Sequence, residues 1–305
     1  MFSNCVFSPQ LVCRSVRFVR IARQSNSAIS LPLIPPTRRK TREPSRFSVV
    51  DAHRMLKRQP WMQLVKLDLS ALTVITAAGG YMLAGGSLFD VQTFIGMLSG
   101  ASLCAMSAAV FNQTKEIAFD SKMQRTKNRP LPSGRISLSQ ARKCGWISGL
   151  AGVGTLLVTT NPWTAVIGAS TILSYIHIYT PLKRITPLNT EVGAVVGSLP
   201  PILGWVAATG GALGPEVAFL FATLFAWQMH HFMAITWRFR KDYEKGGFQM
   251  MSYGDPNGDR TLIKGAFWAA SMALLPPAAV VLGLANPMYV VWGTAANIPL
   301  WCSYY

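Results

Sequence analysis

The sequence predicts an all-α protein whose helices cross a membrane several times, a polytopic transmembrane helical bundle. Half of its 305 residues are hydrophobic and 13% are charged, which is about half the charged share of a typical soluble domain. Several stretches close to twenty residues long contain almost no charge, and about 20 apolar residues are enough to span a bilayer as a helix. These features favour a membrane bundle over the alternative, a soluble all-helical bundle.

Eight apolar segments are expected to form the spans. Glycine, alanine, serine and threonine are abundant in them, as expected where helices pack closely in lipid. Proline pairs at Pro200-Pro201 and Pro276-Pro277 predict kinks in two of the helices. In chain order, the expected spans are Val65–Leu88, Val91–Phe111, Cys144–Thr160, Trp163–Pro181, Val192–Thr209, Val217–Trp237, Gly265–Leu284 and Met288–Trp301.

The charged residues between the spans predict a topology. If the residues before the first span lie inside, then the loops after the second, fourth and sixth spans also lie inside, and these segments hold nearly all the lysine and arginine. The opposite loops contain Asp90 and Glu216 and no basic residue. This distribution follows the positive-inside rule and supports the number of spans.

The N-terminus is rich in arginine and serine and free of acidic residues from Met1 to Arg42. Its arginines at positions 14, 17, 20 and 23 recur every three residues. Such a composition is typical of an organelle transit peptide, which we assign to residues 1–45; a disordered basic tail is the alternative. Residues 46–64 would then form a flank on the inner side of the membrane, and residues 65–305 the membrane domain.

The net charge of +17 does not indicate a nucleic-acid-binding protein. The basic residues are concentrated in the N-terminus and a few loops, and no basic domain of soluble character accompanies them. The five cysteines are scattered and form no CxxC pair, so they indicate neither a zinc site nor a disulfide framework.

A cluster of polar residues directly follows the second span. Asn112, Glu116 and Asp120 are four residues apart, so on a continuing helix they share one face. Oxygen ligands suit a hard cation such as Mg²⁺, which is often shared with substrate phosphates. Basic residues that suit the phosphates themselves follow at Lys122, Arg125, Lys127 and Arg129. The pattern predicts a site for a magnesium-bound diphosphate at the membrane edge; a solvated helix end is the alternative.

Two further clusters lie on the same predicted inner side. Asp242 and the pair Gly246-Gly247 follow the sixth span; they indicate either a second carboxylate opposite the first set or a polar helix end closed by a glycine cap. Tyr179 and Lys183 follow the fourth span one helical turn apart. They indicate either a phosphate-binding pair or an anchor that sets the topology.

The histidines fall into two groups. His177 is expected in the core of the fourth span. His230 and His231 lie within the sixth span, and an ionisable residue at membrane depth is a functional candidate. Either could bind haem iron or form a hydrogen bond to a neighbouring helix.

Taken in this order, the motifs resemble the UbiA-type intramembrane prenyltransferases, and within that family its mitochondrial, haem-farnesylating branch. The resemblance covers about Lys57 to Ala296. It implies a nine-helix fold in which two acidic motifs face a central cavity that opens laterally to lipid. The segments that carry it are Met123-Gln-Arg125-Thr-Lys-Asn-Arg129-Pro-Leu, Tyr179-Thr-Pro-Leu-Lys183-Arg184, Pro200-Pro-Ile-Leu-Gly204-Trp205, and Asp242-Tyr followed by Gly246-Gly247 and Met250-Met251.

The resemblance implies an activity: transfer of the farnesyl group of farnesyl diphosphate to a vinyl group of protohaem IX (haem B), giving haem O. It implies Mg²⁺ as cofactor, the mitochondrial inner membrane with the site on the matrix side, and partners in haem A synthesis or cytochrome c oxidase assembly. The implied catalytic and magnesium-binding residues are Asn112, Glu116, Asp120 and Asp242, the diphosphate-binding residues are Arg125, Arg129, Tyr179, Lys183 and Arg184, and the haem-binding residues are His230 and His231.

The chain departs from the family pattern in three places. Gln113 and Glu116 stand where the first motif usually has aspartate, and His230 stands where bacterial relatives usually have proline. The chain ends at Tyr305, after the eighth span, so the resemblance implies that a ninth helix is missing.

Two other functions stay open. One is a prenyltransferase of the same family that acts on an aromatic quinone precursor. The other is a carrier of haem or ions without chemistry; charge gathered at one face favours chemistry over transport.

Overall fold

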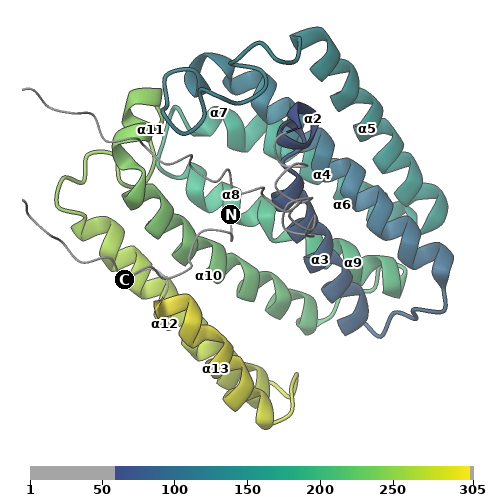
Figure 1. Ribbon diagram of the computed structural model, residues 1–305. Helices are drawn as coiled ribbons and strands as arrows, with labels where there is room; N and C mark the ends of the chain where they lie inside the picture. The colour runs from purple at the N-terminus through teal and green to yellow at the C-terminus, as the bar shows by residue number, and fades with distance from the viewer. Residues whose placement is uncertain (1–58, 303–305) are drawn as a thin grey trace, which may run out of the picture. The chain divides into compact units, whose positions relative to one another are not determined.

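All eight predicted spans are helical in the computed structural model, which describes residues 59–302 (Figure 1). No strand occurs in this range, and five of its helical segments are long and apolar enough to cross a membrane. The predicted fold class, an all-α transmembrane bundle, is confirmed. The helices are α2 (Pro60–Leu64), α3 (Leu67–Leu83), α4 (Val91–Asp120), α5 (Leu138–Thr159), α6 (Pro162–Ser174), the π-helix η1 (Tyr175–Tyr179), α7 (Thr180–Leu182), α8 (Asn189–Gly197), α9 (Leu199–Thr209), α10 (Pro215–Arg238), α11 (Arg240–Gly246), α12 (Asp259–Val281) and α13 (Met288–Cys302).

The predicted targeting segment, residues 1–45, lies outside the described residues, and so does most of the predicted flank. The assignments of the targeting segment and of the flank therefore remain predictions. At the other end of the chain, side chains are described as far as residue 297.

The fourth and fifth spans are each built from successive short helices. The fourth runs through α6, η1 and α7, and its π-turn ends just before Thr180-Pro181. Proline has no N–H to continue an α-helix, and π-turns are frequent at functional sites. The fifth span breaks at Ser198 between α8 and α9, with Pro200 and Pro201 in the first turn of α9, where proline is tolerated. The first proline pair therefore begins a helix, whereas Pro276-Pro277 lie inside α12 as predicted.

Close backbone contact joins α3 to α9. A Cβ atom on Gly80 would overlap with the carbonyl oxygen of Pro201, and one on Gly204 would overlap with the carbonyl oxygen of Ala77. The two glycines thus let two helices approach from both sides, as the abundance of small residues predicts. This contact holds the second half of α3 directly against α9.

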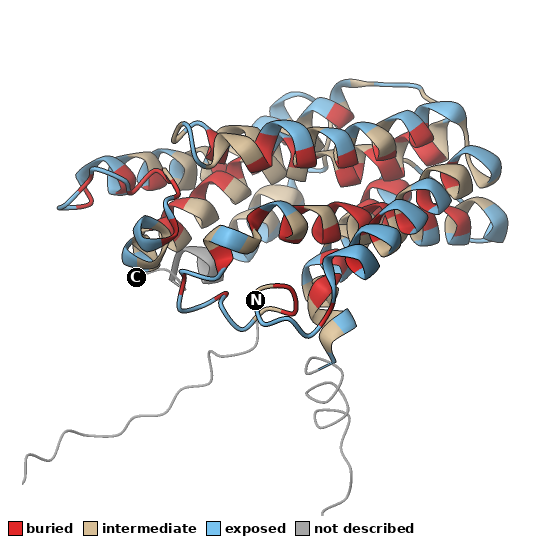
Figure 2. Cartoon of the chain, turned by 90° about the horizontal axis from the view of Figure 1, so that it is seen from above, coloured by how far each residue is buried: buried red, intermediate tan, exposed pale blue. Residues whose placement is uncertain are grey.

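Buried residues lie on the helix sides that face one another, and exposed residues face outward (Figure 2). The main apolar core is formed by α3, α4, α5, α6, η1 and α9, with Tyr81, Met97, Leu156 and Leu203 among its members. Large apolar side chains such as Ile75 and Val158 point outward and are more than half exposed. An outer surface of this kind suits lipid rather than water.

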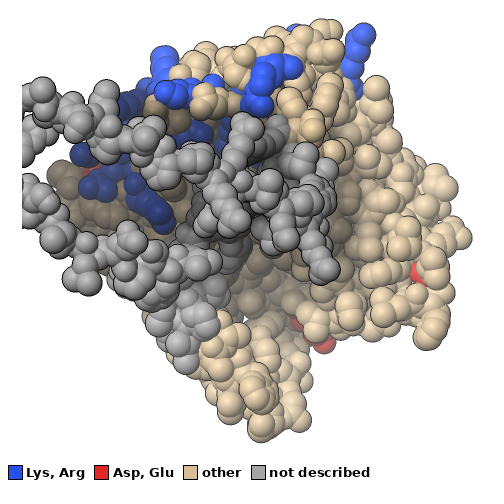
Figure 3. Space-filling model, viewed as in Figure 1, with Lys and Arg blue, Asp and Glu red and all other residues tan. Residues whose placement is uncertain are grey.

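Lysine and arginine side chains gather at the end of the bundle where α4 ends and α5 begins (Figure 3). Most of the remaining visible surface is uncharged. The charge distribution is the one that the positive-inside pattern predicts, and it places the predicted site at the basic end of the bundle.

His177 is a correction to the sequence prediction. It was expected in the core, but its side chain is exposed on η1. Its position within an apolar span does not determine which side of the helix it occupies, and the buried residues of η1 are Ile176 and Tyr179.

Candidate active site at the end of α4

The three oxygen-bearing side chains of the first motif lie together on the last turns of α4. Asn112 and Asp120 are fully buried, and Glu116 is 5% exposed. Their spacing keeps them on one face of the continuous helix. The predicted shared face is therefore present. It lies in the interior of the protein and is not the solvated helix end that was the alternative.

Each of these three side chains accepts a hydrogen bond from a different basic side chain. The Nζ atom of Lys66 lies 2.7 Å from Oδ1 of Asn112. The Nζ atom of Lys183 lies 2.8 Å from Oε1 of Glu116. Nη1 of Arg129 lies 2.7 and 3.0 Å from the two carboxylate oxygens of Asp120. We call these six residues the paired cluster; it holds three basic groups against two carboxylates and one amide.

Lys66 is a site residue that the sequence did not reveal. It directly precedes α3, a position where a lysine normally sets the topology, and its partner Asn112 is 46 residues away. Its backbone has a φ of 50°, the only positive φ at a non-glycine position among the described residues. Such a conformation costs on the order of 1–3 kcal/mol and often occurs at functional sites, which is the one local signal that marks Lys66.

The paired cluster has an excess of positive charge. Burial, together with the neighbouring cations Arg129 and Lys183, lowers the pKa of Lys66 to about 7. Burial also opposes the charge on Lys183, but the carboxylate of Glu116 outweighs it and raises the pKa of Lys183 above its ordinary value. An anion added to the two carboxylates of the paired cluster would therefore be stabilised by all three basic groups.

Gln113 does not belong to the paired cluster. It is fully buried, and its Nε2 donates to the carbonyl oxygens of Gln63 and Leu64 at 3.0 and 2.7 Å. The residue therefore fastens α2 to α4, a task that needs a donor and that an aspartate could not perform.

Tyr179 and Lys183 meet as their spacing predicts. The ammonium group of Lys183 lies 4.5 Å from the centre of the Tyr179 ring, a cation–π distance. Tyr179 fits against α8 because Gly193 has no Cβ, which would otherwise lie 2.6 Å from the ring. The neighbouring Thr180 links this segment to α4, since its Oγ1 accepts a hydrogen bond from Nδ2 of Asn112 at 3.2 Å. Arg184 extends over the ring of Phe119, with 4.8 Å to the ring centre.

Asp242 contacts the loop after α4 instead of the paired cluster. Its two carboxylate oxygens accept from the backbone N–H groups of Gln124 and Arg125 at 2.7 and 3.2 Å. The side chain of Arg125 in turn reaches the hydroxyl group of Tyr243 at 3.1 Å. Gly247, with a φ of 75°, ends α11 as a glycine cap. Among the described residues, no three His, Cys, Asp or Glu side chains are close enough together to hold a metal ion.

The two histidines of α10 have different surroundings. His230 is 4% exposed, and its Nδ1 lies 3.0 Å from the carbonyl oxygen of Gly265 on α12, the interhelical hydrogen bond that was the alternative to a functional role. His231 is half-buried and stacks on Trp227, with ring centres 5.2 Å apart.

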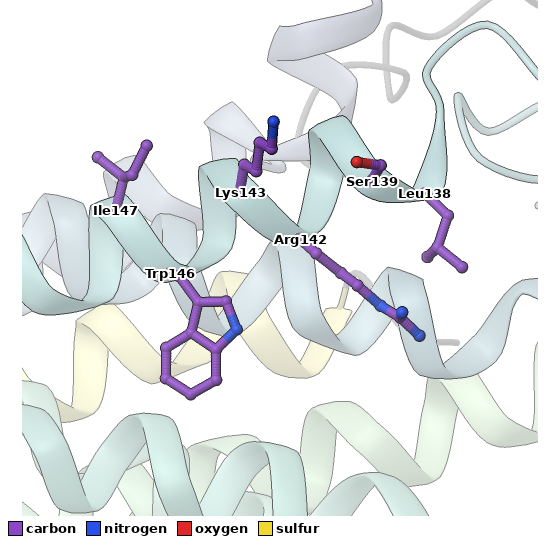
Figure 4. A pocket seen from close by; sticks show the side chains of 6 residues that line it. All are labelled: Leu138, Ser139, Arg142, Lys143, Trp146 and Ile147. Carbon is purple, nitrogen blue, oxygen red and sulfur yellow. The ribbon is translucent and has the colours of Figure 1, made fainter.

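A hollow on the surface of α5 shares no residue with this site (Figure 4). Arg142 and Lys143 line it one helical turn before Trp146 and Ile147. Basic residues beside an exposed tryptophan suit a helix at the membrane–water interface.

Comparison with known proteins finds relatives in sequence and in fold. The sequence profile of the UbiA prenyltransferase family matches residues 73–305. The chain is 44% identical over 194 residues to the human protein called protoheme IX farnesyltransferase, mitochondrial, which is 64% of this chain and 43% of that protein. It is 43% identical over 203 residues to the Arabidopsis thaliana protein of the same name, covering 66% of this chain and 46% of the relative. The matched region is thus less than half the length of these two mitochondrial relatives.

A bacterial relative is matched over more of its length. The protoheme IX farnesyltransferase of Flavobacterium psychrophilum is 39% identical over 219 residues, 70% of this chain and 72% of that protein. Two solved structures have the same fold. A UbiA homolog from Aeropyrum pernix aligns with a TM-score of 0.65 and 17% identity, over 75% of this chain and 84% of that one. A UbiA homolog from Archaeoglobus fulgidus, bound to GPP and Mg²⁺, aligns with a TM-score of 0.63 and 15% identity, over 79% of this chain and 86% of that one.

Proposed function

The chain belongs to the UbiA prenyltransferase family, and on that premise we propose that it transfers the farnesyl group of farnesyl diphosphate to a vinyl group of protohaem IX, giving haem O. The names of the relatives support this acceptor over an aromatic quinone precursor. The same names support a mitochondrial membrane, and we place the protein in the inner membrane with the paired cluster on the matrix side. Its product would enter haem A synthesis for cytochrome c oxidase.

The paired cluster is the observation that carries the proposal. It combines oxygen atoms that suit Mg²⁺ as ligands with three basic groups that suit phosphate oxygens. Both sets lie in an interior that water reaches poorly. The Archaeoglobus fulgidus relative, which binds GPP together with Mg²⁺, supports the same combination of ligands. Charges in such a place interact more strongly than they would in water.

The oxygen atoms of Asn112, Glu116 and Asp120 fit a hard cation by their chemistry, and these residues would hold Mg²⁺. Asp242 is a proposed further ligand, and it also fixes the loop that carries Arg125. When bound, the ion would neutralise negative charge on the diphosphate. The remaining steps depend on side chains of the chain itself.

Catalysis would come from stabilising the leaving group. As the bond between the allylic carbon and the diphosphate oxygen breaks, its electron pair passes to the diphosphate, and Lys66, Arg129 and Lys183 would bind the growing charge. Tyr179 would position Lys183, while Arg125 and Arg184 would bind the outer phosphate oxygens. The vinyl group of haem then forms the new carbon–carbon bond, and water adds to the resulting cation with loss of a proton. The apolar spans would keep bulk water from the allylic cation before this step.

His231 is the better candidate for contact with haem. The ring of His230 already bonds to the backbone of α12, and its loss would disturb helix packing. His231 lies on the stacked, half-buried side of α10 beside Trp227, where a flat aromatic acceptor could bind.

The activity can be tested with the membrane-reconstituted chain, protohaem, farnesyl diphosphate and Mg²⁺, followed by mass analysis of the haem. We expect a product heavier by farnesyl plus water. Asp120→Ala should abolish turnover and leave the protein in the membrane, whereas Glu244→Ala, an exposed acidic residue on α11, should turn over normally. Prenylation of an aromatic quinone precursor in place of haem, or undiminished activity of Asp120→Ala, would contradict the proposal.

A further inference from the structure

The paired cluster has a property that the proposed reaction does not require. All three oxygen-bearing side chains of α4 that would bind a metal ion already accept a hydrogen bond from a basic group of the protein itself. The two carboxylates have side chains that are 6% and 1% exposed. A divalent cation that approached alone would meet occupied ligands.

The cost of replacing these cations decides what can bind. Mg²⁺ gives up its water shell reluctantly. To reach Glu116 or Asp120 it would have to displace Lys183 or Arg129, and the displaced group would stay partly buried without a partner. An unpaired charge in a protein interior is strongly unfavourable, so a free divalent cation gains little at this site.

A diphosphate changes the balance because it supplies the missing partner. Lys66, Arg129 and Lys183 reach the same face of α4 from three separate segments: the turn before α3, the loop after α4, and the residue after α7. An anion bound among them can pair with all three. Each basic group that turns to the anion frees one oxygen ligand for the metal ion.

We propose that the paired cluster is a counter-ion lock: the site binds a divalent cation only together with a diphosphate, through an exchange of ionic partners in which Lys66, Arg129 and Lys183 move from α4 to the anion. This inference rests on the proposed function, because it assigns the same residues to diphosphate and metal. It makes the binding of the two ligands strongly cooperative. It also means that the metal ion leaves with the pyrophosphate, when the basic groups return to α4.

The lock can be tested with Mn²⁺ as the metal probe and inorganic pyrophosphate as the anion. Bound Mn²⁺ is measured by electron paramagnetic resonance on the full chain in lipid nanodiscs, with and without pyrophosphate, and radiolabelled pyrophosphate is measured with and without Mn²⁺. Protein-free samples correct for the complex that the two ligands form in solution. We expect pyrophosphate to tighten Mn²⁺ binding at least tenfold, and Mn²⁺ to tighten pyrophosphate binding by the same factor.

Removing one cation should open the lock. Lys183→Met frees Glu116, so Mn²⁺ should bind at least tenfold more tightly without pyrophosphate than it binds the unaltered chain, while pyrophosphate binding weakens. The pyrophosphate-free gain should saturate at one Mn²⁺ per chain, whereas misfolding would expose many weak metal ligands. Lys66→Met is the milder second variant, because it leaves a neutral amide unpaired, and it should shift both affinities in the same directions. Lys264→Met is the matched control: it breaks the ion pair with Glu191 outside the cluster and should change neither affinity.

The outcomes separate the two hypotheses. If Mn²⁺ and pyrophosphate both bind but neither affects the other, the lock is refuted and the proposed function stands. If neither ligand binds the unaltered chain at all, the proposed function fails and the lock fails with it. If Lys183→Met and Lys66→Met bind Mn²⁺ no better than the unaltered chain, the basic groups do not compete with the metal, and the lock is refuted.

Discussion

At the scale of single residues, the site depends on buried charges that compensate one another in pairs. Among the residues that the structure describes, Lys183 and Glu116 form the most enclosed ion pair, with side chains that are 13% and 6% exposed. Taking two charges from water is costly, so such a pair adds little net stability, but removing one member leaves the other charge unpaired. The pair is therefore better explained by a binding role than by a contribution to folding.

This view predicts an asymmetry between single and double variants. Lys183→Met should lower the free energy of unfolding by about 3 kcal/mol, because it leaves Glu116 charged and buried. Adding Glu116→Gln should restore more than half of the loss, since no unpaired charge remains. Thermal unfolding in detergent micelles measures both effects. Equal stability of the unaltered chain and Lys183→Met would show that Glu116 has another partner.

Sequence reasoning predicted those contacts that join residues close together in the chain. Asn112, Glu116 and Asp120 share a face because of their spacing on one helix, and Tyr179 meets Lys183 for the same reason. Lys66 was missed because its role comes from a contact between segments 46 residues apart. The hydrogen bonds that Asp242 accepts from the loop after α4 have the same origin: no local pattern shows which distant backbone amides a carboxylate will meet.

At the scale of helices, hydropathy located the spans but not their internal breaks. The eight apolar segments correspond to helices, yet α4 continues nine residues beyond the apolar stretch that ends at Phe111, as far as Asp120. This polar extension bears Asn112, Glu116 and Asp120, so it places the site beyond the apolar part of the helix. Contacts between elements then decide where the other site residues lie: the hydrogen bonds from Gln113 to the carbonyl oxygens of Gln63 and Leu64 hold the segment before Lys66 against α4. The helix that follows, α3, is packed closely against α9.

That contact predicts the effect of one methyl group. Gly204→Ala should destabilise the protein by roughly 1–3 kcal/mol, because the added Cβ overlaps with the backbone carbonyl of Ala77 on α3 and a backbone cannot give way easily. Gly154→Ala is the matched control in α5, where nothing lies within 4 Å of the added atom. The control should be neutral or stabilising by up to about 1 kcal/mol. Thermal unfolding of both variants provides the comparison, and equal midpoints would argue against tight contact of α3 with α9.

At the scale of the whole molecule, charge and apolar surface are separated along the bundle. The outward faces of the helices carry large exposed apolar side chains, while lysine and arginine gather at the end that holds the paired cluster. Two amphipathic substrates would share this division, with lipid-soluble bodies in the apolar region and acidic groups at the basic end. The sidedness of the chain in its membrane therefore decides from which compartment the diphosphate enters.

The charge pattern predicts that sidedness. In a chain without its native cysteines, a cysteine at Lys245, exposed in the last turn of α11, should react with a membrane-impermeant thiol reagent only from the matrix side. A cysteine at Ala212, exposed in the loop between α9 and α10, should react only from the opposite side, because α10 separates the two positions by a full span. Labelling of intact and inverted inner-membrane vesicles distinguishes the two directions. Reaction of both cysteines from the same side would mean that α10 does not cross the membrane, whereas exchange of the two sides would keep the spans but reverse the orientation, and would place the entry of the diphosphate on the outer side.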